Sequence, residues 1–220
     1  MIWAALIGGV ALVPKGFRVE FAVDQVIDRT QTIKDVGASA FQFELGETGG
    51  VTTWNYVSAT GDVTWKRIIA TDLLGRALGE SFVQKTGPAT ESWSFESQGA
   101  KLIFKRDDVA QTLAAAPGQL LDWRQSKSMR ATAKSGASVT SLAFDPTTPG
   151  TTAYKLSYVG RATLKIGVRT VRTEVFLRAM KGWTERIWLD GDIPVRFEDQ
   201  ANGAPGRVVF RATSVAAISQ

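Results

Sequence analysis

The stretch that decides the fold is Phe17-Arg18-Val19-Glu20-Phe21-Ala22-Val23-Asp24, in which apolar and polar side chains alternate residue by residue. The same spacing returns in Phe41-Gln42-Phe43-Glu44-Leu45. A β-strand sends successive side chains to opposite faces, so this spacing predicts strands with one packed face and one face in water. We expect the phenylalanines and valines of both stretches to face the interior.

Similar stretches follow along the 220 residues, separated by short turns rich in glycine. Such turns favour antiparallel neighbours, because a parallel return needs a crossover of a dozen or more residues. The sequence therefore predicts a mainly β protein: a single strongly curved antiparallel sheet of about fourteen strands, shaped as a half-barrel or spiral-like barrel. We assign residues 17–220 to one β domain, since all-β units commonly reach about 200–250 residues.

One short helix is expected in mid-chain, over residues 107–116. An aspartate can cap its start, Val109 and Leu113 recur at helical spacing, and Pro117-Gly118 ends it. We expect this helix to cover one end or open face of the sheet. Residues 129–133 are then expected to form a strand.

The apolar residues change parity in the last third of the chain. Leu164 and Ile166 fall on even numbers, whereas Val171 and Val175 fall on odd numbers. A single regular strand cannot do this, because a shift of one residue moves every side chain to the other face. A turn or bulge must therefore fall near residues 167–170, and we interpret the stretch as a hairpin.

An apolar run begins at Met1 and continues to Val13, and Pro14-Lys15-Gly16 is typical of a turn. A helix needs about 20 residues to span a bilayer, so this run is not predicted to be transmembrane. Three interpretations of the segment 1–16 stay open: a buried first strand, the end of an export signal, or an apolar arm that docks on a protein partner. We favour the buried strand.

Histidine and cysteine are both absent. This excludes Ser-His-Asp and Cys-His nucleophiles, the usual His/Cys metal sites, disulfides and thiol redox chemistry. Neither a phosphate-binding glycine motif nor a calcium loop occurs. We predict no catalytic residue, no metal site and no cofactor, and the lack of cysteine leaves the compartment open.

The net charge of +5 lies entirely in the last third, where eleven basic residues face six acidic ones from Thr151 onward. Such a face suits an acidic partner, anionic lipid headgroups or another anion, while nucleic acid is not favoured. The other interpretation is an ordinary solvated sheet face, which we favour. The candidate residues for a partner or anion face are Arg161, Lys165, Arg169, Arg172 and Arg178.

Seven tryptophans are many for this length. Indole rings serve cores, apolar ligand cavities and stacking platforms, and core packing is the commoner use. Trp183 shares a strand face with Ile187 and Leu189, whereas Trp188 lies on the opposite face and is expected at the surface or in a cavity. The candidate ligand-binding residues are Trp54, Tyr56, Trp93, Trp123 and Trp188.

The C-terminal third also carries a resemblance. It runs from Tyr154-Lys155-Leu156-Ser157-Tyr158-Val159-Gly160 to Trp183-Thr184-Glu185-Arg186-Ile187-Trp188-Leu189-Asp190-Gly191-Asp192-Ile193-Pro194-Val195-Arg196-Phe197-Glu198. This stretch resembles the end of several domain-of-unknown-function families of exported Gram-negative proteins, in which a strand ends in a Trp-Leu or Trp-Tyr-Asp turn and resumes as Pro-Val-Arg. Those families are similar in architecture to the lipoprotein carriers of the envelope, in which a curved sheet wraps partly around a helix or an apolar ligand. The resemblance implies a periplasmic or envelope-associated protein, and it supplies no catalytic residue.

The leading hypothesis is a non-enzymatic, envelope-associated β-protein that binds a lipid-like ligand or a protein partner in the concavity of the curved sheet. The alternative is a structural subunit of a larger assembly, which would use the apolar N-terminal arm and the basic C-terminal sheet face. A weaker alternative is a carboxylate-dependent glycan hydrolase, tested by replacing Glu91 and Glu185. An apolar void of about 300 Å³ or more would favour binding, and a filled interior would favour a scaffold.

Overall fold

The computed structural model describes residues 15–28, 30–107, 109–114 and 120–218. These residues form fourteen strands and one helix, α1 (Lys127–Lys134). The strands are β1 (Gly16–Val26), β2 (Thr32–Leu45), β3 (Gly49–Ser58), β4 (Val63–Asp72), β5 (Ala77–Thr86), β6 (Ala89–Gln98), β7 (Lys101–Arg106), β8 (Val109–Ala114), β9 (Val139–Asp145), β10 (Gly150–Ile166), β11 (Arg169–Met180), β12 (Trp183–Asp190), β13 (Ile193–Ala201) and β14 (Arg207–Ile218).

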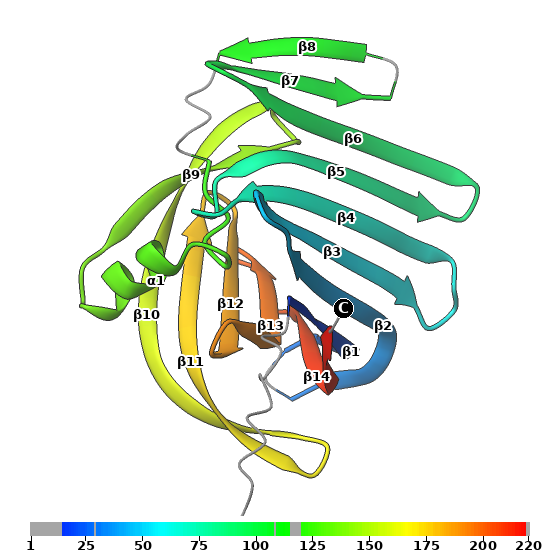
Figure 1. The fold of residues 1–220 in the computed structure, drawn as a ribbon. Helices are drawn as coiled ribbons and strands as arrows, with labels where there is room; N and C mark the ends of the chain where they lie inside the picture. The colour runs from blue at the N-terminus through cyan, green and yellow to red at the C-terminus, as the bar shows by residue number, and fades with distance from the viewer. Residues whose placement is uncertain (1–14, 29, 108, 115–119, 219–220) are drawn as a thin grey trace, which may run out of the picture.

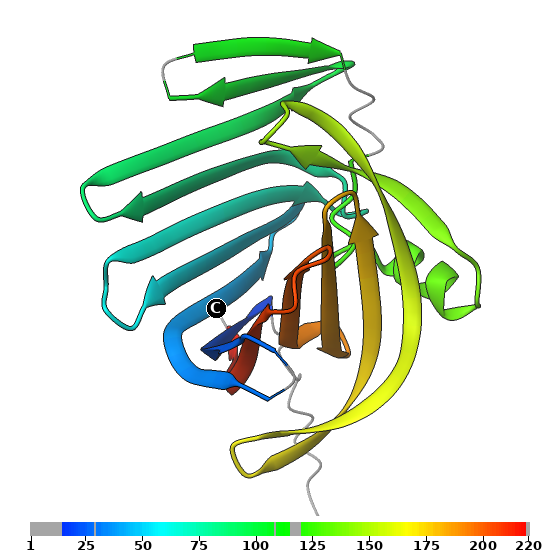
Figure 2. The same cartoon turned by 180° about the vertical axis from the view of Figure 1, so that it is seen from behind.

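All fourteen strands belong to one antiparallel sheet, in the order β8-β7-β6-β5-β4-β3-β2-β1-β14-β13-β12-β11-β10-β9. β1 lies in the middle and pairs with both β2 and β14, so the first and last strands are neighbours. Each half continues outward as a meander, and the whole sheet is strongly curved (Figures 1 and 2). The sheet does not close into a barrel: within the described residues, β8 and β9 are its two edges.

The alternation that predicted the sheet also sets its core. Val19 and Phe41 are fully buried and face each other across β1 and β2. The ring of Phe41 lies 5.9 Å from Phe197, and Trp54 of β3 stacks on Phe197 at 4.7 Å. Phe197 belongs to β13, in the other half of the sheet, so aromatic contacts join the two halves across the concave side.

A second core cluster joins the outer ends of the sheet. Phe144 of β9 packs against Phe95 of β6 at 4.7 Å and against Phe104 of β7 at 5.2 Å between ring centroids. These strands are far apart in the sheet order but close in space. The concave side is therefore enclosed from both flanks.

The prediction of a helix over residues 107–116 is wrong. Asp107 has a φ of +52° in the turn after β7, and the chain returns as strand β8. Leu113 pairs with Leu102 on β7. Val109 and Leu113 are four residues apart, a spacing that suits both a helix and alternate positions of a strand, and the free edge of β7 decides in favour of the strand.

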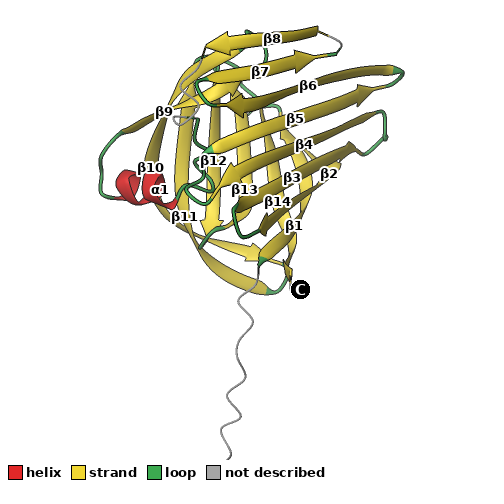
Figure 3. Ribbon diagram, turned by 45° about the horizontal axis from the view of Figure 1, so that its top comes forward, coloured by secondary structure: helices red, strands yellow, loops and turns green. Residues whose placement is uncertain are grey.

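The observed helix is α1, where a strand was expected over residues 129–133. Ser126 caps it, because its hydroxyl accepts a hydrogen bond from the amide of Met129 at 3.4 Å. Met129 and Ala133 lie one turn apart and are buried, and the helix packs beside β9 and β10 (Figure 3). The expected strand is wrong because the Ser126 cap favours a helix, whereas the four-residue spacing of Met129 and Ala133 fits either element.

The hairpin inferred from the change of parity is confirmed. β10 and β11 are joined by a turn at Gly167 and Val168, and the φ of Gly167 is +56°. Leu164 and Val171 are cross-strand partners, so residues of unlike parity share one face. A register shift between Tyr158 and Gly160 adds a bulge to β10.

Within the described residues, α1 is the only helix, and no helix has the length and apolar character needed to cross a bilayer. The apolar run from Met1 to Val13 lies outside the described residues. Its interpretation as a first strand, an export signal or a docking arm stays a prediction.

Candidate functional site

A short piece of chain crosses the concave side of the sheet ahead of α1, and we call residues 120–126 the inner segment. The amide of Ala77 donates to the carbonyl of Leu120 at 2.7 Å, and the amide of Asp122 donates to the carbonyl of Gly75 at 2.9 Å. These bonds tie the inner segment to the turn between β4 and β5. The segment packs inward, since Leu120 is buried.

The inner segment carries charged side chains into the interior. Nε of Arg124 lies 3.0 Å from Oδ1 of Asp122, and its Nη1 lies 3.4 Å from Oε1 of Glu185 on β12. Arg178 of β11 meets the other oxygen of Glu185 at 2.9 Å, and the indole of Trp123 donates to that oxygen at 3.2 Å. Glu185 is 1% exposed, so this is an ion cluster withdrawn from water.

Burial and neighbouring charges shift the pKa values of residues in and beside the ion cluster. Burial, followed by the charge of Glu185, raises the pKa of Asp199, the cross-strand partner of Glu185, to about 8. Burial also opposes ionisation of Asp122, but Arg124 outweighs it and holds the pKa of Asp122 below its ordinary value. Burial lowers the pKa of Arg178, and Arg124 adds to that effect although Glu185 opposes it. At neutral pH, Asp199 therefore favours its protonated form.

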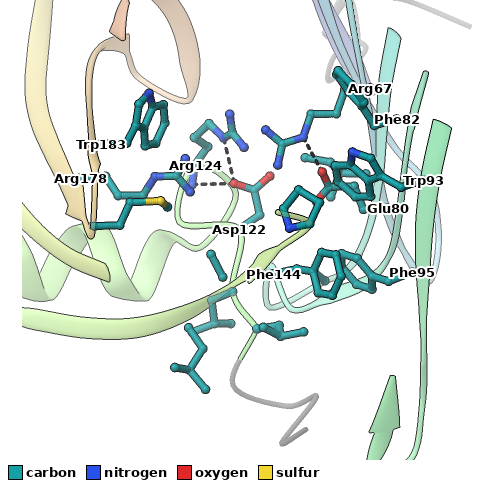
Figure 4. Close-up of a pocket in the computed structure, with 18 residues that line it drawn as sticks. Arg67, Glu80, Phe82, Trp93, Phe95, Asp122, Arg124, Phe144, Arg178 and Trp183 are labelled. Carbon is teal, nitrogen blue, oxygen red and sulfur yellow. Dashed lines mark hydrogen bonds and ion pairs between the residues drawn. The ribbon is translucent and has the colours of Figure 1, made fainter. Parts of the chain in front are cut away.

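One side of the ion cluster opens into a cavity of about 350 Å³, which we call the arginine pocket. The guanidinium groups of Arg67, Arg124 and Arg178 approach Asp122 there from different elements (Figure 4). Arg67 of β4 also pairs through Nε with Glu80 of β5 at 2.6 Å. The lining thus holds three cations against two carboxylates.

The remaining wall of the arginine pocket is aromatic. Phe82 stacks on Trp93 at 5.6 Å, and Phe144 contacts Trp93 at 5.8 Å. On the opposite side, the guanidinium of Arg178 lies 5.0 Å from the ring of Trp183. The pocket therefore combines flat apolar surfaces with charged groups.

A larger cavity of about 900 Å³, which we call the apolar cavity, lies at the other end of the inner segment. Its walls come from strands β1 to β4, β11, β13 and β14, from α1 and from the turn between β4 and β5. Leu73 and Leu74, in that turn, are 64% and 65% exposed. The apolar side chains that line it are Phe17, Phe43, Leu45, Leu73, Leu74, Ile193, Val215 and Ala217.

The charged groups that line the apolar cavity are mostly cationic: Lys15, Lys127, Arg130 and Arg169, with the carboxylates Asp72 and Asp192. Asp192 meets Lys127 at 2.9 Å and Arg130 at 2.5 Å, and Asp72 pairs with a residue outside the lining. Arg169 has no ion pair with any described carboxylate. The lining therefore carries more cations than carboxylates, beside its apolar side chains.

The five aromatic candidates have different positions. Trp93 lines the arginine pocket. Trp54 and Trp123 are buried in the core, each with its indole N–H satisfied, by the hydroxyl of Ser39 at 2.8 Å and by Glu185. Tyr56 is half-buried and stacks on Trp65. Trp188 is buried under the guanidinium of Arg196, so its expected place at the surface is wrong, and it lines neither cavity.

The basic candidates also separate. Arg161, Lys165 and Arg172 are exposed and share one face of the β10–β11 hairpin, as the register shows. Arg169, opposite Ile166, lies on the other face and lines the apolar cavity. Arg178 is 6% exposed and belongs to the ion cluster, so it does not share the exposed face of the hairpin, and its role towards an anion stays a prediction. The cause is a strong partner inside, Glu185, which compensates the guanidinium.

The two carboxylates named for a glycan hydrolase are not brought together. Glu91 lies on β6 at the surface, 3.7 Å from Arg106. Glu185 is held in the interior by Arg124 and Arg178. Acid and base groups of a hydrolase must flank one bond, and this pair does not.

Several lining residues were not identified from the sequence, above all Arg67, Glu80 and Asp122. A usable signal existed for Arg178 and Glu185. Arg178 lies two residues from both Phe176 and Met180, on the same face of its strand. Glu185 lies two residues from both Trp183 and Ile187 in the same way, so both charges occupy positions of an apolar strand face. A charge at such a position indicates a buried pair.

Comparison with solved structures finds a crystal structure of a DUF1329 family protein from Desulfovibrio piger. It is 6% identical over 93% of this chain and 86% of that chain, with a TM-score of 0.26. No protein-family model matches the sequence, and neither does any curated protein. The site is therefore interpreted from its own geometry.

Proposed function

We propose that this protein binds a single-chain amphiphile with an anionic head group in the apolar cavity, without catalysing its conversion. The observation that carries the proposal is the cavity of about 900 Å³ whose walls include Leu73 and Leu74, two large apolar side chains left mostly exposed. Apolar side chains that gather around a concavity of this size are typical of ligand sites. A filled interior would have favoured a scaffold.

The size of the apolar cavity suits one acyl chain. At about 30 Å³ for each heavy atom, the share of a water molecule in the liquid, it has room for about 30 heavy atoms. Each methylene buried there contributes about 0.8 kcal/mol. Two added methylenes should therefore tighten binding about tenfold, until the chain fills the cavity.

The charges on the rim select the head group. Lys127 and Arg130 are compensated by Asp192, whereas Arg169 faces the cavity without a described carboxylate partner. An anionic head group at the mouth would meet Arg169 while its chain packs on the leucines. A cationic head group of the same length would be repelled.

The test is calorimetric titration of delipidated protein with fatty acids of eight to sixteen carbons, below their micelle concentrations, and with alkyltrimethylammonium ions of matched length. We expect saturable binding of the acids, tightening with chain length, and weaker binding of the cations. Organic extraction of the native protein should release an amphiphile. Absence of saturable binding, together with an empty extract, would overturn the proposal.

Matched variants locate the site. Leu73→Gln combined with Leu74→Gln should weaken fatty-acid binding at least tenfold, while Val109→Gln combined with Val168→Gln, which changes two exposed valines outside the cavity, should leave it unchanged. Equal affinity of the two double variants would show that the acids bind elsewhere.

Head-group selection has its own pair of variants. Arg169→Gln should reduce the preference for acids over cations, whereas Arg161→Gln, on the other face of the same hairpin, should not. If both substitutions change the preference equally, the charge of the whole hairpin and not the cavity rim attracts the acids.

We place this binding activity in the bacterial envelope, on the strength of the resemblance in the C-terminal third. Cell fractionation of the native host tests that placement. Light scattering tests the competing structural role: assembly that grows with concentration in protein that binds no amphiphile would favour a subunit of a larger structure over a binding protein.

A further inference from the structure

The arginine pocket shares no lining residue with the apolar cavity. We propose that it is a second binding site, which takes a small aromatic hydroxy acid: a carboxylate with a neighbouring hydroxyl group on a flat apolar body. The proposal goes beyond amphiphile binding and does not depend on it.

The first argument comes from two buried polar atoms. Nε of Arg178 and Oδ2 of Asp122 are buried, and neither has a hydrogen-bond partner within the described part of the chain. Both residues are less than a tenth exposed and line the pocket. Proteins rarely leave such groups unpaired, because burial removes the hydrogen bonds that each would make with water. The donor needs an acceptor and the acceptor needs a donor, and a carboxylate next to a hydroxyl supplies both.

The second argument is charge. Three guanidiniums line the arginine pocket, while Glu80 and Asp122 are the carboxylates in the described lining. Glu185 compensates Arg124 and Arg178 from behind, and Asp199 beside it is neutral at pH 7 because burial and Glu185 raise its pKa to about 8. With Glu185 the cluster is neutral overall, but Glu185 lies behind the arginines and outside the described lining, so the lining itself holds one more cation than carboxylates and favours a carboxylate ligand over a cation.

The third argument is shape. The rings of Phe82, Trp93, Phe95 and Phe144 form a continuous wall, with centroid separations of 5.6, 5.8 and 4.7 Å along it. Such a wall suits the face or edge of another ring. At about 30 Å³ for each heavy atom, the pocket of about 350 Å³ holds about twelve heavy atoms, the size of an aryl hydroxy acid.

The test uses three probes of nearly equal size: 3-phenyllactate, 3-phenylpropanoate, which lacks the hydroxyl, and 3-phenylpropane-1,2-diol, which lacks the carboxylate. Binding is followed by calorimetry and by quenching of tryptophan fluorescence, since Trp93 and Trp183 line the pocket. We expect phenyllactate to bind at least ten times more tightly than either analogue. Equal affinities for all three, or no binding of phenyllactate at millimolar concentration, would overturn the proposal.

A variant ties the binding to the pocket. Arg67→Gln should weaken phenyllactate at least tenfold, because the guanidinium of Arg67 faces the ligand and its side chain is partly exposed, at 28%. Arg18→Gln removes an arginine from an exposed ion pair far from the pocket and is the control. Should Arg67→Gln not fold, Phe82→Leu, which removes a half-buried ring from the wall, replaces it with the same expected direction. Phenyllactate binding that none of these substitutions changes would refute the assignment.

Each of the two proposals can be refuted without the other. Fatty acids are titrated into Arg67→Gln, and phenyllactate is titrated into the double leucine variant, Leu73→Gln with Leu74→Gln. Since the cavities share no residue, each substitution should affect only its own ligand. Loss of phenyllactate binding in the leucine variant would show that there is one site and not two, and would overturn the second site.

Discussion

Replacing Asp199 by asparagine should remove most of the pH dependence of stability between pH 5 and pH 8. Asp199 lies opposite Glu185 across β12 and β13, and its Oδ1 is buried without a hydrogen-bond partner within the described residues. Burial and the charge of Glu185 raise its pKa to about 8. Asparagine has nearly the same shape and no charge to lose, so it mimics the protonated acid.

The sign and size follow from proton binding. In the unfolded chain the carboxyl of Asp199 titrates near its ordinary value of 3.8, so between about pH 5 and 7 the folded protein holds one more proton than the unfolded chain. The stabilisation by this proton is complete below the unfolded value and is lost as pH rises through the folded pKa. One proton corresponds to about 1.4 kcal/mol of unfolding free energy per pH unit, or about 3 kcal/mol over two units.

Other carboxylates affect stability in a lower pH range. Asp122 and Asp192 have lowered pKa values despite burial, because Arg124 in one case and Lys127 with Arg130 in the other compensate their charges. Their stabilisation is present above the ordinary carboxyl range and is lost only as pH falls below about 4. Stability should therefore fall on both sides of a maximum between about pH 4 and 5, and the alkaline side belongs to Asp199.

The assay is urea unfolding monitored by tryptophan fluorescence at pH 5.5, 6.5, 7.5 and 8.5, for the natural protein, for Asp199→Asn, and for Glu47→Gln, an exposed control. The natural protein and the control should lose stability as pH rises, and Asp199→Asn should stay nearly level. A natural protein whose stability is constant or increases over this range would refute the reasoning, as would an asparagine variant that keeps the slope.

Three further substitutions test the packing around the inner segment. Arg178→Met should cost about 3–5 kcal/mol of unfolding free energy in urea, because it leaves Glu185 with less compensation in the interior; a loss below 1 kcal/mol would contradict a buried pair. Ser126→Ala removes the cap of α1 and should cost about 0.5–2 kcal/mol, seen as a lower melting temperature; an unchanged value would mean that the cap does not hold the helix. Gly75→Ala should cost more than Gly61→Ala, since both have a positive φ but only a Cβ at Gly75 would come within 2.8 Å of the amide nitrogen of Ser126; equal losses in calorimetry would refute the close approach.

The sheet was predictable because its signal is local. Alternation in Phe17 to Asp24 fixes which side chains of a strand share a face, and short glycine turns fix antiparallel neighbours. The parity change beyond Leu164 predicted a turn or bulge near residues 167–170, and the turn lies at Gly167 and Val168. Closure was not predictable, because whether the edges pair depends on β8 and β9 meeting in space.

The helix was not predictable for a physical reason that two segments share. Val109 and Leu113 in one, and Met129 and Ala133 in the other, stand four residues apart, a spacing that fits a strand and a helix equally well. The first segment forms strand β8 because it pairs with the edge of β7. Ser126 capped the second as a helix.

The site was harder to predict from the sequence than the fold, because the curvature of the sheet brings the residues of the arginine pocket together from distant elements. Arg67, Asp122 and Arg178 come from β4, the inner segment and β11, and only the approach of the two flanks brings them together. The number of tryptophans indicated aromatic residues for core packing or ligand binding, and it did not indicate the buried arginines. Of the five aromatic candidates, Trp93 lines the pocket, while Trp54 and Trp123 are held by their own indole hydrogen bonds.

The ion cluster supports the proposed second binding site. Burying Arg124, Arg178 and Glu185 removes three charges from water, and well-packed apolar residues of similar volume often stabilise a fold as well or better. The rest of the concave side shows that this chain can fill space with aromatic rings, as around Phe197. The proposed recognition of an anion would account for cations that converge where a pocket opens beside them, because a fixed and partly desolvated guanidinium binds a carboxylate more strongly than one in free solution.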